Sequence, residues 1–169
     1  IRMRLVGSEM CIRDRLGSGA GEVLASIAGA LKSRSGSLTL NGETFLPKSP
    51  SQAIKKKIAY CSSDRKKDGL FLGRPIFENL TSPALDTISK FGFNFGSTED
   101  SYAKNLAQEF LIDVKRVYDE SGLLSGGNQQ KVALGKWLSI KPDVLLVNEP
   151  TRGVDAVSYT HLRAHETHP

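Results

Sequence analysis

Apolar side chains recur at helical spacing in three parts of the chain. Residues 22–31 (EVLASIAGAL) place five of them on one helical face, directly after a glycine-rich loop. Residues from about 80 to 120 show the same spacing, and Ser97 and Asp100 have the separation of a capping box at a helix start. A third helix is predicted after a Ser-Gly-Gly turn and ends before the Lys-Pro pair at 141–142.

Two short segments have the pattern of strands. Leu38 and Leu40 alternate with polar residues, and the Asn-Gly pair at 41–42 is typical of a hairpin turn. Residues 55–64 (KKKIAYCSSD) predict a short strand that leads into a charged loop.

The run VLLV at 144–147 is apolar at every position. A strand that is apolar on both faces belongs in the middle of a parallel sheet covered by helices. We therefore expect an α/β fold with a mainly parallel core sheet and a helical insert before this last strand. Active sites in such sheets lie beyond the carboxyl ends of the strands, where Asn148 and Glu149 stand.

Composition narrows the class of protein. The chain has 169 residues, 39% hydrophobic and 24% charged, which is ordinary for one globular domain. No apolar run approaches the roughly 18 residues of a membrane span, so a soluble, cytoplasmic domain is expected. Two cysteines are too few for a disulfide framework. The net charge is +5, but the basic residues are scattered, and no nucleic-acid partner is expected.

The two ends differ in composition from the middle. Both methionines and all three histidines lie in the first 15 or the last 13 residues. The end segments resemble translated adapter read-through, as seen at the ends of metagenomic protein fragments. We therefore expect residues 1–15 and 157–169 to be foreign to the gene and to have no part in the fold. The alternative is a pair of native flexible tails.

The first candidate chemistry lies in LGSGAGEV, residues 16–23, a glycine-rich loop that opens a helix. Backbone N–H groups and the helix dipole at such a start suit a phosphate. A complete phosphate loop also carries a lysine for the terminal phosphates and a hydroxyl for magnesium. With Gly17 and Gly19 in register, the lysine position holds Ala20 and the hydroxyl position holds Gly21. The motif alone is also consistent with a plain strand-to-helix turn that binds no phosphate.

The second candidate is the pair at the end of the buried strand. In nucleotide hydrolases an aspartate there serves magnesium, and a following glutamate can polarise the attacking water. Asn148 offers a neutral carbonyl, which brings no charge to a hard cation. Glu149 could instead cap the next turn.

The third candidate consists of two motifs, LSGGNQQK at 124–131 and NEPTRGVD at 148–155. One helix and one strand separate them. Each motif is specific in order and spacing, and chance occurrence of both is negligible.

On these motifs the sequence resembles an ATP-binding cassette (ABC) domain. More narrowly, it resembles the second of two tandem cassettes in bacterial sugar-import ATPases of the ribose, galactose and xylose type. The segment at 49–73 (SPSQAIKKKIAYCSSDRKKDGLFLG) is similar to that group's region around the Q-loop. The resemblance covers residues 16–156 and implies a P-loop NTPase-like fold with a helical subdomain at about 80–130.

The resemblance assigns roles residue by residue. The nucleotide-binding positions are those of the degenerate phosphate loop and of the signature: Gly17, Ser18, Gly19, Ala20, Gly21, Glu22, Ser125, Gly126, Gly127, Asn128 and Gln129. Glu149 matches the catalytic glutamate, Asn148 replaces the metal-binding aspartate, Ser63 stands at the Q-loop position and Asp155 lies in the D-loop.

Such cassettes work as head-to-tail pairs, in which a nucleotide lies between the phosphate loop of one and the signature of the other. The resemblance therefore implies ATP and Mg²⁺ as cofactors, with a second cassette and transmembrane permease subunits as partners. A sugar-binding protein is an indirect partner, and the location is the inner face of the bacterial membrane. The missing lysine and Asn148 belong to the domain's own site, whereas Ser125 to Gly127 would serve the partner's nucleotide.

Two other functions remain open. One is a non-hydrolysing regulatory or structural cassette that only completes a partner's site. The other is a cassette ATPase without a transport role, against which the sugar-type segments TRGVD and DRKKDG argue. Without the first strand and the elements after residue 156, we expect the chain alone neither to fold cooperatively nor to hydrolyse ATP.

Overall fold

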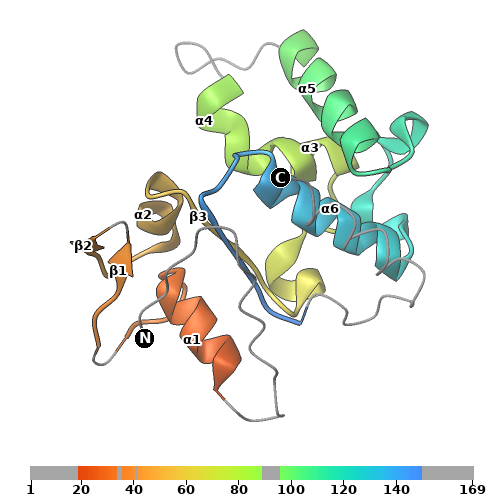
Figure 1. The fold of residues 1–169 in the computed structure, drawn as a ribbon. Helices are drawn as coiled ribbons and strands as arrows, with labels where there is room; N and C mark the ends of the chain where they lie inside the picture. Colours follow the sequence, from red (N-terminus) through yellow and green to blue (C-terminus); the bar gives the residue numbers. More distant parts are fainter. Residues whose placement is uncertain (1–18, 34–35, 41, 89–95, 150–169) are drawn as a thin grey trace. The chain divides into compact units, whose positions relative to one another are not determined.

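A computed structural model describes residues 19–33, 36–40, 42–88 and 96–149. The described residues, drawn in colour in Figure 1, form two compact units. One boundary between the units falls within the strand at residues 58–61. The first unit contains residues 19–60 and 142–148, and the second contains 61–141 and Glu149.

The first unit combines two helices with four short strands. In chain order these are α1 (Ala20–Ile27), β1 (Thr39–Leu40), β2 (Glu43–Thr44), α2 (Pro50–Lys55), β3 (Ile58–Cys61) and β4 (Val144–Val147). Its core is formed by Ala28, Ala53, Ile58 and Leu146, with Leu24 and Phe45 among the apolar side chains packed around them. Segments from both ends of the described chain therefore share one hydrophobic core.

The expected hairpin and strands are present. Strands β1 and β2 pair antiparallel, and Gly42 in their turn has φ 85°. Strands β3 and β4 are neighbours in a second sheet. The amides of Asp143 and Val144 donate to the carbonyl of Lys57 at 2.9 and 3.1 Å, so both strands begin at the same end and run parallel.

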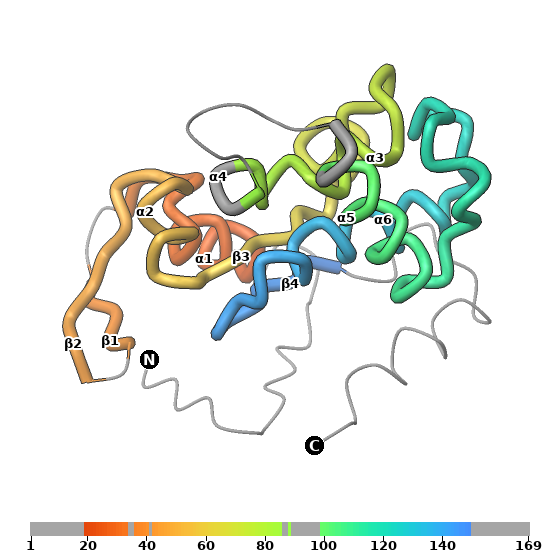
Figure 2. Tube along the Cα trace, turned by 90° about the horizontal axis from the view of Figure 1, so that it is seen from above, coloured from red at the N-terminus to blue at the C-terminus, as the bar shows by residue number. Residues whose placement is uncertain are grey.

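The second unit is helical and contains the element on which the signature motif lies. It contains the π-helical turn η1 (Arg65–Gly69), α3 (Ile76–Thr81), α4 (Leu85–Ile88), α5 (Gly96–Glu109), α6 (Gly126–Leu138) and the short 3₁₀ turns Ser82–Ala84, Val114–Arg116 and Ser121–Leu123. Helix α3 packs against both α5 and α6 (Figure 1; Figure 2). Ile76 and Leu80 of α3 and Val132 of α6 are fully buried at the centre of this unit.

Three element predictions need correction. The helix predicted over 22–31 begins at Ala20 and ends at Ile27, because Gly29 adopts φ 71° and terminates it. Leu31 is consequently 47% exposed rather than part of the apolar face. The predicted start at Ser97 is also displaced, since α5 already begins at Gly96.

The third correction concerns residues 50–55, for which no helix was predicted. They form α2, which begins at Pro50. Proline suits the first position of a helix, because the amide that it lacks would have no partner within the helix there.

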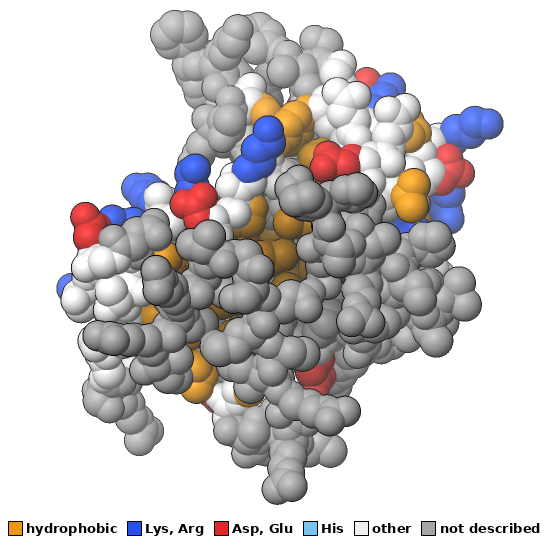
Figure 3. All heavy atoms as spheres, in the orientation of Figure 1, with side chains coloured by type: hydrophobic (Ala, Val, Ile, Leu, Met, Phe, Trp, Pro, Cys, Tyr) orange, Lys and Arg blue, Asp and Glu red, His pale blue; other side chains and the backbone are white. Residues whose placement is uncertain are grey.

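Where Figure 3 draws described residues, basic and acidic side chains lie near one another, mainly along the upper part of the view. Among the described residues, no helix has the length and apolar character needed to cross a membrane.

Candidate functional site

The glycine loop leads into α1 through a left-handed turn. Gly19 is the residue before the helix, with φ 77°, and its carbonyl accepts the amide of Val23 at 3.0 Å. Glycine suits this position because a β-carbon disfavours positive φ. Ala20, Gly21 and Glu22 form the first turn of the helix, while Gly17 and Ser18 lie outside the described residues.

The structure brings Gly21 and Asn148 together in the first unit. A β-carbon placed on Gly21 would stand 2.9 Å from Nδ2 of Asn148 and 3.7 Å from its Oδ1. The start of α1 and the end of β4 therefore meet at these two predicted site residues.

These residues do not fit a magnesium ion. The position expected to supply a hydroxyl has no side chain, and an amide nitrogen is the atom nearest to it. Mg²⁺ prefers oxygen ligands, commonly carboxylates, and the pair supplies no charge. In the described part of the chain, no group of three His, Cys, Asp or Glu side chains could hold a metal either.

Glu149, the predicted catalytic residue, has an uncommon backbone conformation. Its φ is 49°, in the left-handed region that favours glycine. Backbone strain of this kind clusters at functional sites. Sequence reasoning placed Glu149 after the strand, but it gave no signal for this conformation.

Ser125 begins α6 as its N-cap. The Oγ of Ser125 accepts the amide of Asn128 at 3.4 Å, and the side chain of Ser125 is exposed. Gly126 and Gly127 form the first turn, where backbone N–H groups have no partner within the helix. The exposed start of a 13-residue helix is thus open to an anion.

Gln129 differs from the other predicted nucleotide-binding residues. It is buried, its Nε2 donates to the carbonyl of Ser121 at 3.4 Å, and its Oε1 accepts Nε of Arg65 at the same distance. Its side-chain amide is therefore engaged within the second unit. Direct contact between Gln129 and a nucleotide stays a prediction.

Ser63 lies in the turn between β3 and η1. Its neighbour Ser62 accepts the amide of Asp64 at 3.2 Å and donates to a carboxylate oxygen of Asp68 at 3.4 Å. Asp64 in turn caps η1 by accepting the amide of Lys67 at 3.1 Å. Ser63 is therefore held in a structured, partly exposed turn, and its role at the Q-loop position stays a prediction.

Sequence reasoning missed Lys136 and Asn79, which are buried and join separate segments of the second unit. The only available signal was a polar residue within an apolar helical pattern. Which carbonyls and rings these side chains meet could not be read from the sequence. The predicted D-loop residue, Asp155, lies outside the described residues.

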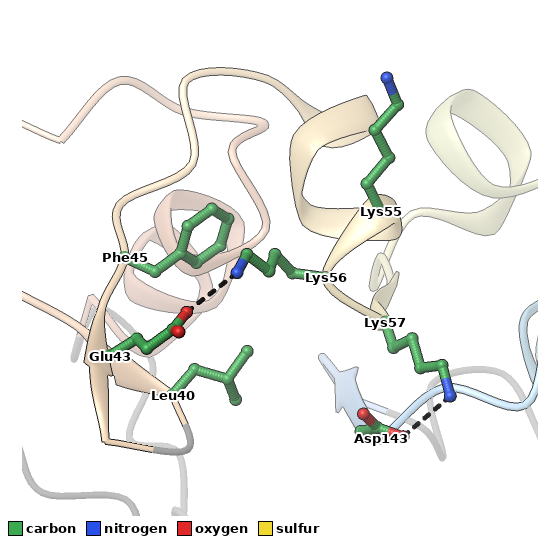
Figure 4. A pocket seen from close by; sticks show the side chains of 7 residues that line it. All are labelled: Leu40, Glu43, Phe45, Lys55, Lys56, Lys57 and Asp143. Atoms are coloured by element: carbon green, nitrogen blue, oxygen red, sulfur yellow. Dashed lines mark hydrogen bonds and ion pairs between the residues drawn. The ribbon is translucent and has the colours of Figure 1, made fainter.

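A cavity of about 230 Å³ in the first unit is separate from the predicted site residues. Its walls are formed by Leu40, Glu43, Phe45, Lys55, Lys56, Lys57 and Asp143 (Figure 4). Lys56 pairs with Glu43 at 3.1 Å, and Lys57 pairs with Asp143 at 3.7 Å. Because these acids already neutralise two of the lysines, the cavity offers only a weak attraction for an anion.

A family model and the sequences of similar proteins agree on one protein family. The model of the family described as "ABC transporter" matches residues 9–152. The ribose import ATP-binding protein RbsA of Streptococcus agalactiae serotype III (strain NEM316) is 42% identical over 140 residues, which cover 83% of this chain and 28% of that protein. The xylose import ATP-binding protein XylG of Thermoanaerobacter pseudethanolicus (strain ATCC 33223 / 39E) is 41% identical over 150 residues, covering 88% and 30%. The chain thus spans less than a third of the length of these relatives.

Solved structures show the same fold. The dimeric post-hydrolysis state of the ATP-binding cassette MJ0796 bound to ADP and Pi superposes with a TM-score of 0.72 at 21% identity, covering 90% of this chain and 67% of that one. A nucleotide-free ATP-binding cassette from an ABC transporter gives 0.66 at 21% identity, covering 89% and 62%. The chain therefore has the α/β fold of these cassettes, as the motifs predicted.

Proposed function

Because this chain belongs to the ABC transporter family, we propose that it is an ATP-binding cassette of a bacterial sugar importer. The observation that carries the proposal is the motif LSGGNQQK, with Ser125 at the exposed start of α6. The relatives named as ribose and xylose import proteins supply the substrate class, a carbohydrate. The resemblance to tandem-type motifs supports a position as the second of two cassettes in a longer protein.

The proposed role of this cassette is asymmetric. Its own phosphate loop has Ala20 in place of lysine and Gly21 in place of a hydroxyl residue, and Asn148 replaces aspartate. The loss of a lysine removes a charge-assisted contact worth roughly 1.5–3 kcal/mol. The signature motif, in contrast, is intact. We infer that the cassette supplies its signature to ATP held by the phosphate loop of its partner.

The residues at the start of α6 can each contribute to binding a terminal phosphate. The hydroxyl of Ser125 accepts a hydrogen bond from Asn128 and can still donate its proton to a phosphate oxygen. The backbone amides of Gly126 and Gly127 lie at the positive end of the helix dipole. These groups would stabilise charge that develops on the γ-phosphate as ATP is hydrolysed.

Glu149 would polarise water at the cassette's own site. Its contribution should be small, because Asn148 and Gly21 do not suit magnesium. Productive hydrolysis is therefore assigned to the partner's phosphate loop and this chain's signature.

The proposed assembly follows from these separate roles of the signature motif and the partner's phosphate loop. A second cassette completes both ATP sites, permease subunits in the membrane receive the closing motion, and a sugar-binding protein delivers the substrate. The cassette would lie on the cytoplasmic face of the membrane. No role in nucleic-acid binding is proposed.

The test compares Ser125→Tyr with Glu149→Gln in the complete ATP-binding protein assembled with its permease. Blocking the signature should reduce sugar-stimulated ATP hydrolysis by about a hundredfold or more, because donors aimed at developing charge have effects of this size. Glu149→Gln should have a smaller effect. Ser51→Tyr, at an exposed serine in the first turn of α2, is the matched control and should be near normal. Equal damage from Glu149→Gln and Ser125→Tyr would refute the asymmetry.

A second candidate is a cassette that completes the partner's site without hydrolysing any nucleotide of its own. The close approach of Asn148 to Gly21 favours this narrower role. Counting exchangeable, hydrolysable nucleotides in the complete protein separates the two. Two such nucleotides, one of them hydrolysed slowly, indicate that the cassette's own site retains some activity, and one indicates the regulatory role.

A further inference from the structure

Lys136 carries an ammonium group into the interior of the second unit. The residue is only 6% exposed, although lysine is rarely buried without a partner. Its Nζ donates to the carbonyl of Gly69 at 2.6 Å. Within the described part of the chain, Lys136 forms no ion pair with Asp or Glu.

Two aromatic rings stabilise this charge. The Nζ of Lys136 lies 5.7 Å from the ring centroid of Phe71 and 5.2 Å from that of Trp137, within the range of cation–π attraction. Burial nevertheless lowers the pKa of Lys136. The ammonium is thus held in a specific pocket of one carbonyl and two rings.

The carbonyl that Lys136 binds closes the π-helical turn η1. Gly69 is the last residue of η1, and the amide of Leu70 donates back to Arg65 at 2.7 Å. Arg65, at the other end of η1, donates to Gln129 at 3.4 Å. Gln129 and Lys136 lie on one face of α6, separated by about two helical turns. Helix α6 therefore holds both ends of η1.

The chain beyond η1 is tied to the segment that precedes the signature. The carbonyl of Leu72 accepts the amide of Gly122 at 2.8 Å, and the carbonyl of Arg74 accepts the amide of Ser121 at 3.0 Å. A residue that fixes the position of η1 therefore also affects the position of residues 121–124, which lead directly to Ser125 at the start of α6.

We propose that Lys136 is a positioning residue, which locks η1 against α6 and thereby sets the position of the signature serine, Ser125. The proposal rests on the proposed function, in which Ser125 contacts ATP bound by the partner cassette. Lys136 itself touches no nucleotide. Its effect is transmitted through the Gly69 carbonyl and the fixed geometry of α6.

The variant Lys136→Met tests the idea in the complete ATP-binding protein. Methionine keeps most of the apolar stem and removes the ammonium. Hydrogen exchange in residues 64–71 should become faster, because the clamp on Gly69 is lost. The kcat of ATP hydrolysis should fall about tenfold with little change in KM, because the partner's loop still binds ATP while the signature is misplaced. Lys136→Arg, which can still donate to the carbonyl, should restore part of both.

Lys104→Met is the matched control. The Nζ of Lys104, on α5, pairs with Asp100 at 2.8 Å and lies 5.6 Å from the ring centroid of Tyr118, and neither contact involves η1 or the signature motif. It should change neither exchange in 64–71 nor kcat. If Lys136→Met does not fold, Arg65→Met replaces it as the test variant. It removes the hydrogen bond from Arg65 to Gln129 on α6 and should give the same two effects at smaller size.

The outcomes are distinct. Unchanged exchange in 64–71 for Lys136→Met overturns the positioning role, whatever the function of the protein. Faster exchange with unchanged kcat, in a preparation where Ser125→Tyr abolishes hydrolysis, also overturns it. If Ser125→Tyr itself leaves hydrolysis intact, the proposed function fails and the role of Lys136 fails with it.

Discussion

The amide nitrogen of Asn148 lies 2.9 Å from the point where a β-carbon on Gly21 would stand. Two departures from a complete nucleotide site, far apart in the sequence, are therefore neighbours in the fold. A serine at 21 would bring its β-carbon against the Asn148 amide, and an aspartate at 148 would face a position without a hydroxyl. Restoring one residue alone is expected to restore little.

We predict that the double variant Gly21→Ser/Asn148→Asp gains a magnesium-dependent nucleotide site. The hydroxyl and the carboxylate are oxygen ligands of the kind that Mg²⁺ prefers. A fluorescent ATP analogue should bind the double variant at least about tenfold more tightly in Mg²⁺ than in EDTA, a difference of about 1.4 kcal/mol. The measurement uses the complete protein with the phosphate-loop lysine of the partner cassette replaced, so that only this site is read.

The two single variants are the controls for that experiment, and each should bind nucleotide almost equally in Mg²⁺ and in EDTA. The unchanged site should also show a ratio near one. A strong magnesium requirement in the unchanged protein would contradict the conclusion that Gly21 and Asn148 do not suit the ion.

A second prediction concerns Asn79, which is fully buried on α3. Its Oδ1 accepts the amide of Phe71 at 2.8 Å, and its Nδ2 donates to the carbonyl of Phe71 and to Oγ of Ser121, both at 3.0 Å. Asn79→Ala removes the partner of each of these groups, at a cost of about 1–3 kcal/mol. Hydrogen exchange at the Phe71 amide should rise accordingly, and limited proteolysis should cut near residues 71–75.

Asn105→Ala provides the matched control, because Asn105 is exposed on α5. Substitutions at such positions usually change the free energy of unfolding by less than about 0.5 kcal/mol. Equal exchange rates at the Phe71 amide in the two variants would show that the Asn79 contacts do not stabilise residues 71–75.

A third prediction concerns the reactivity of Cys61. Burial raises the pKa of the Cys61 thiol to about 11, although the charges of Lys136 and Arg65 act in the opposite direction. Because the thiolate is the reactive form, the native protein should resist iodoacetamide at pH 8, with labelling at least about a hundredfold slower than in urea. Labelling should accelerate only as the pH approaches the raised pKa. Mass spectrometry of the Cys61 peptide distinguishes this site from Cys11.

Ser62→Cys gives a matched thiol one residue along, where the side chain is partly exposed. It should react quickly in the native protein. Rapid native labelling of Cys61 itself would show that the strand end opens more readily than its burial indicates.

Local signals in the sequence were sufficient to predict several elements of this domain and its family. A helix was predicted after the Ser-Gly-Gly turn, and α6 lies there, although it already begins at Gly126. It begins there because the Ser125 hydroxyl satisfies an amide that the first turn leaves without a partner. Strands β3 and β4 lie where their apolar runs were found. The motif at 124–131 was by itself specific enough to indicate the family, and the family match confirms it.

Other features depend on backbone conformations that the pattern of apolar residues does not show. The end of α1 was misplaced because apolar spacing continues past Gly29, whereas the positive φ of that glycine stops the helix. The conformation of Glu149, with φ 49°, has no local sequence signal.

The sequence by itself determined the family, the places of several helices and strands, and the residue types at each motif, because these depend on neighbours a few positions apart. Only the tertiary structure decided that Lys136 meets a carbonyl 67 positions earlier and that Asn148 stands against Gly21. The physical reason is that burial and hydrogen-bond partners are set by long-range packing. From the sequence alone, a lysine within an apolar helical pattern is predicted to be exposed, because a buried charge without a partner is costly. In the fold, Lys136 can be buried because one carbonyl and two aromatic rings stabilise its charge.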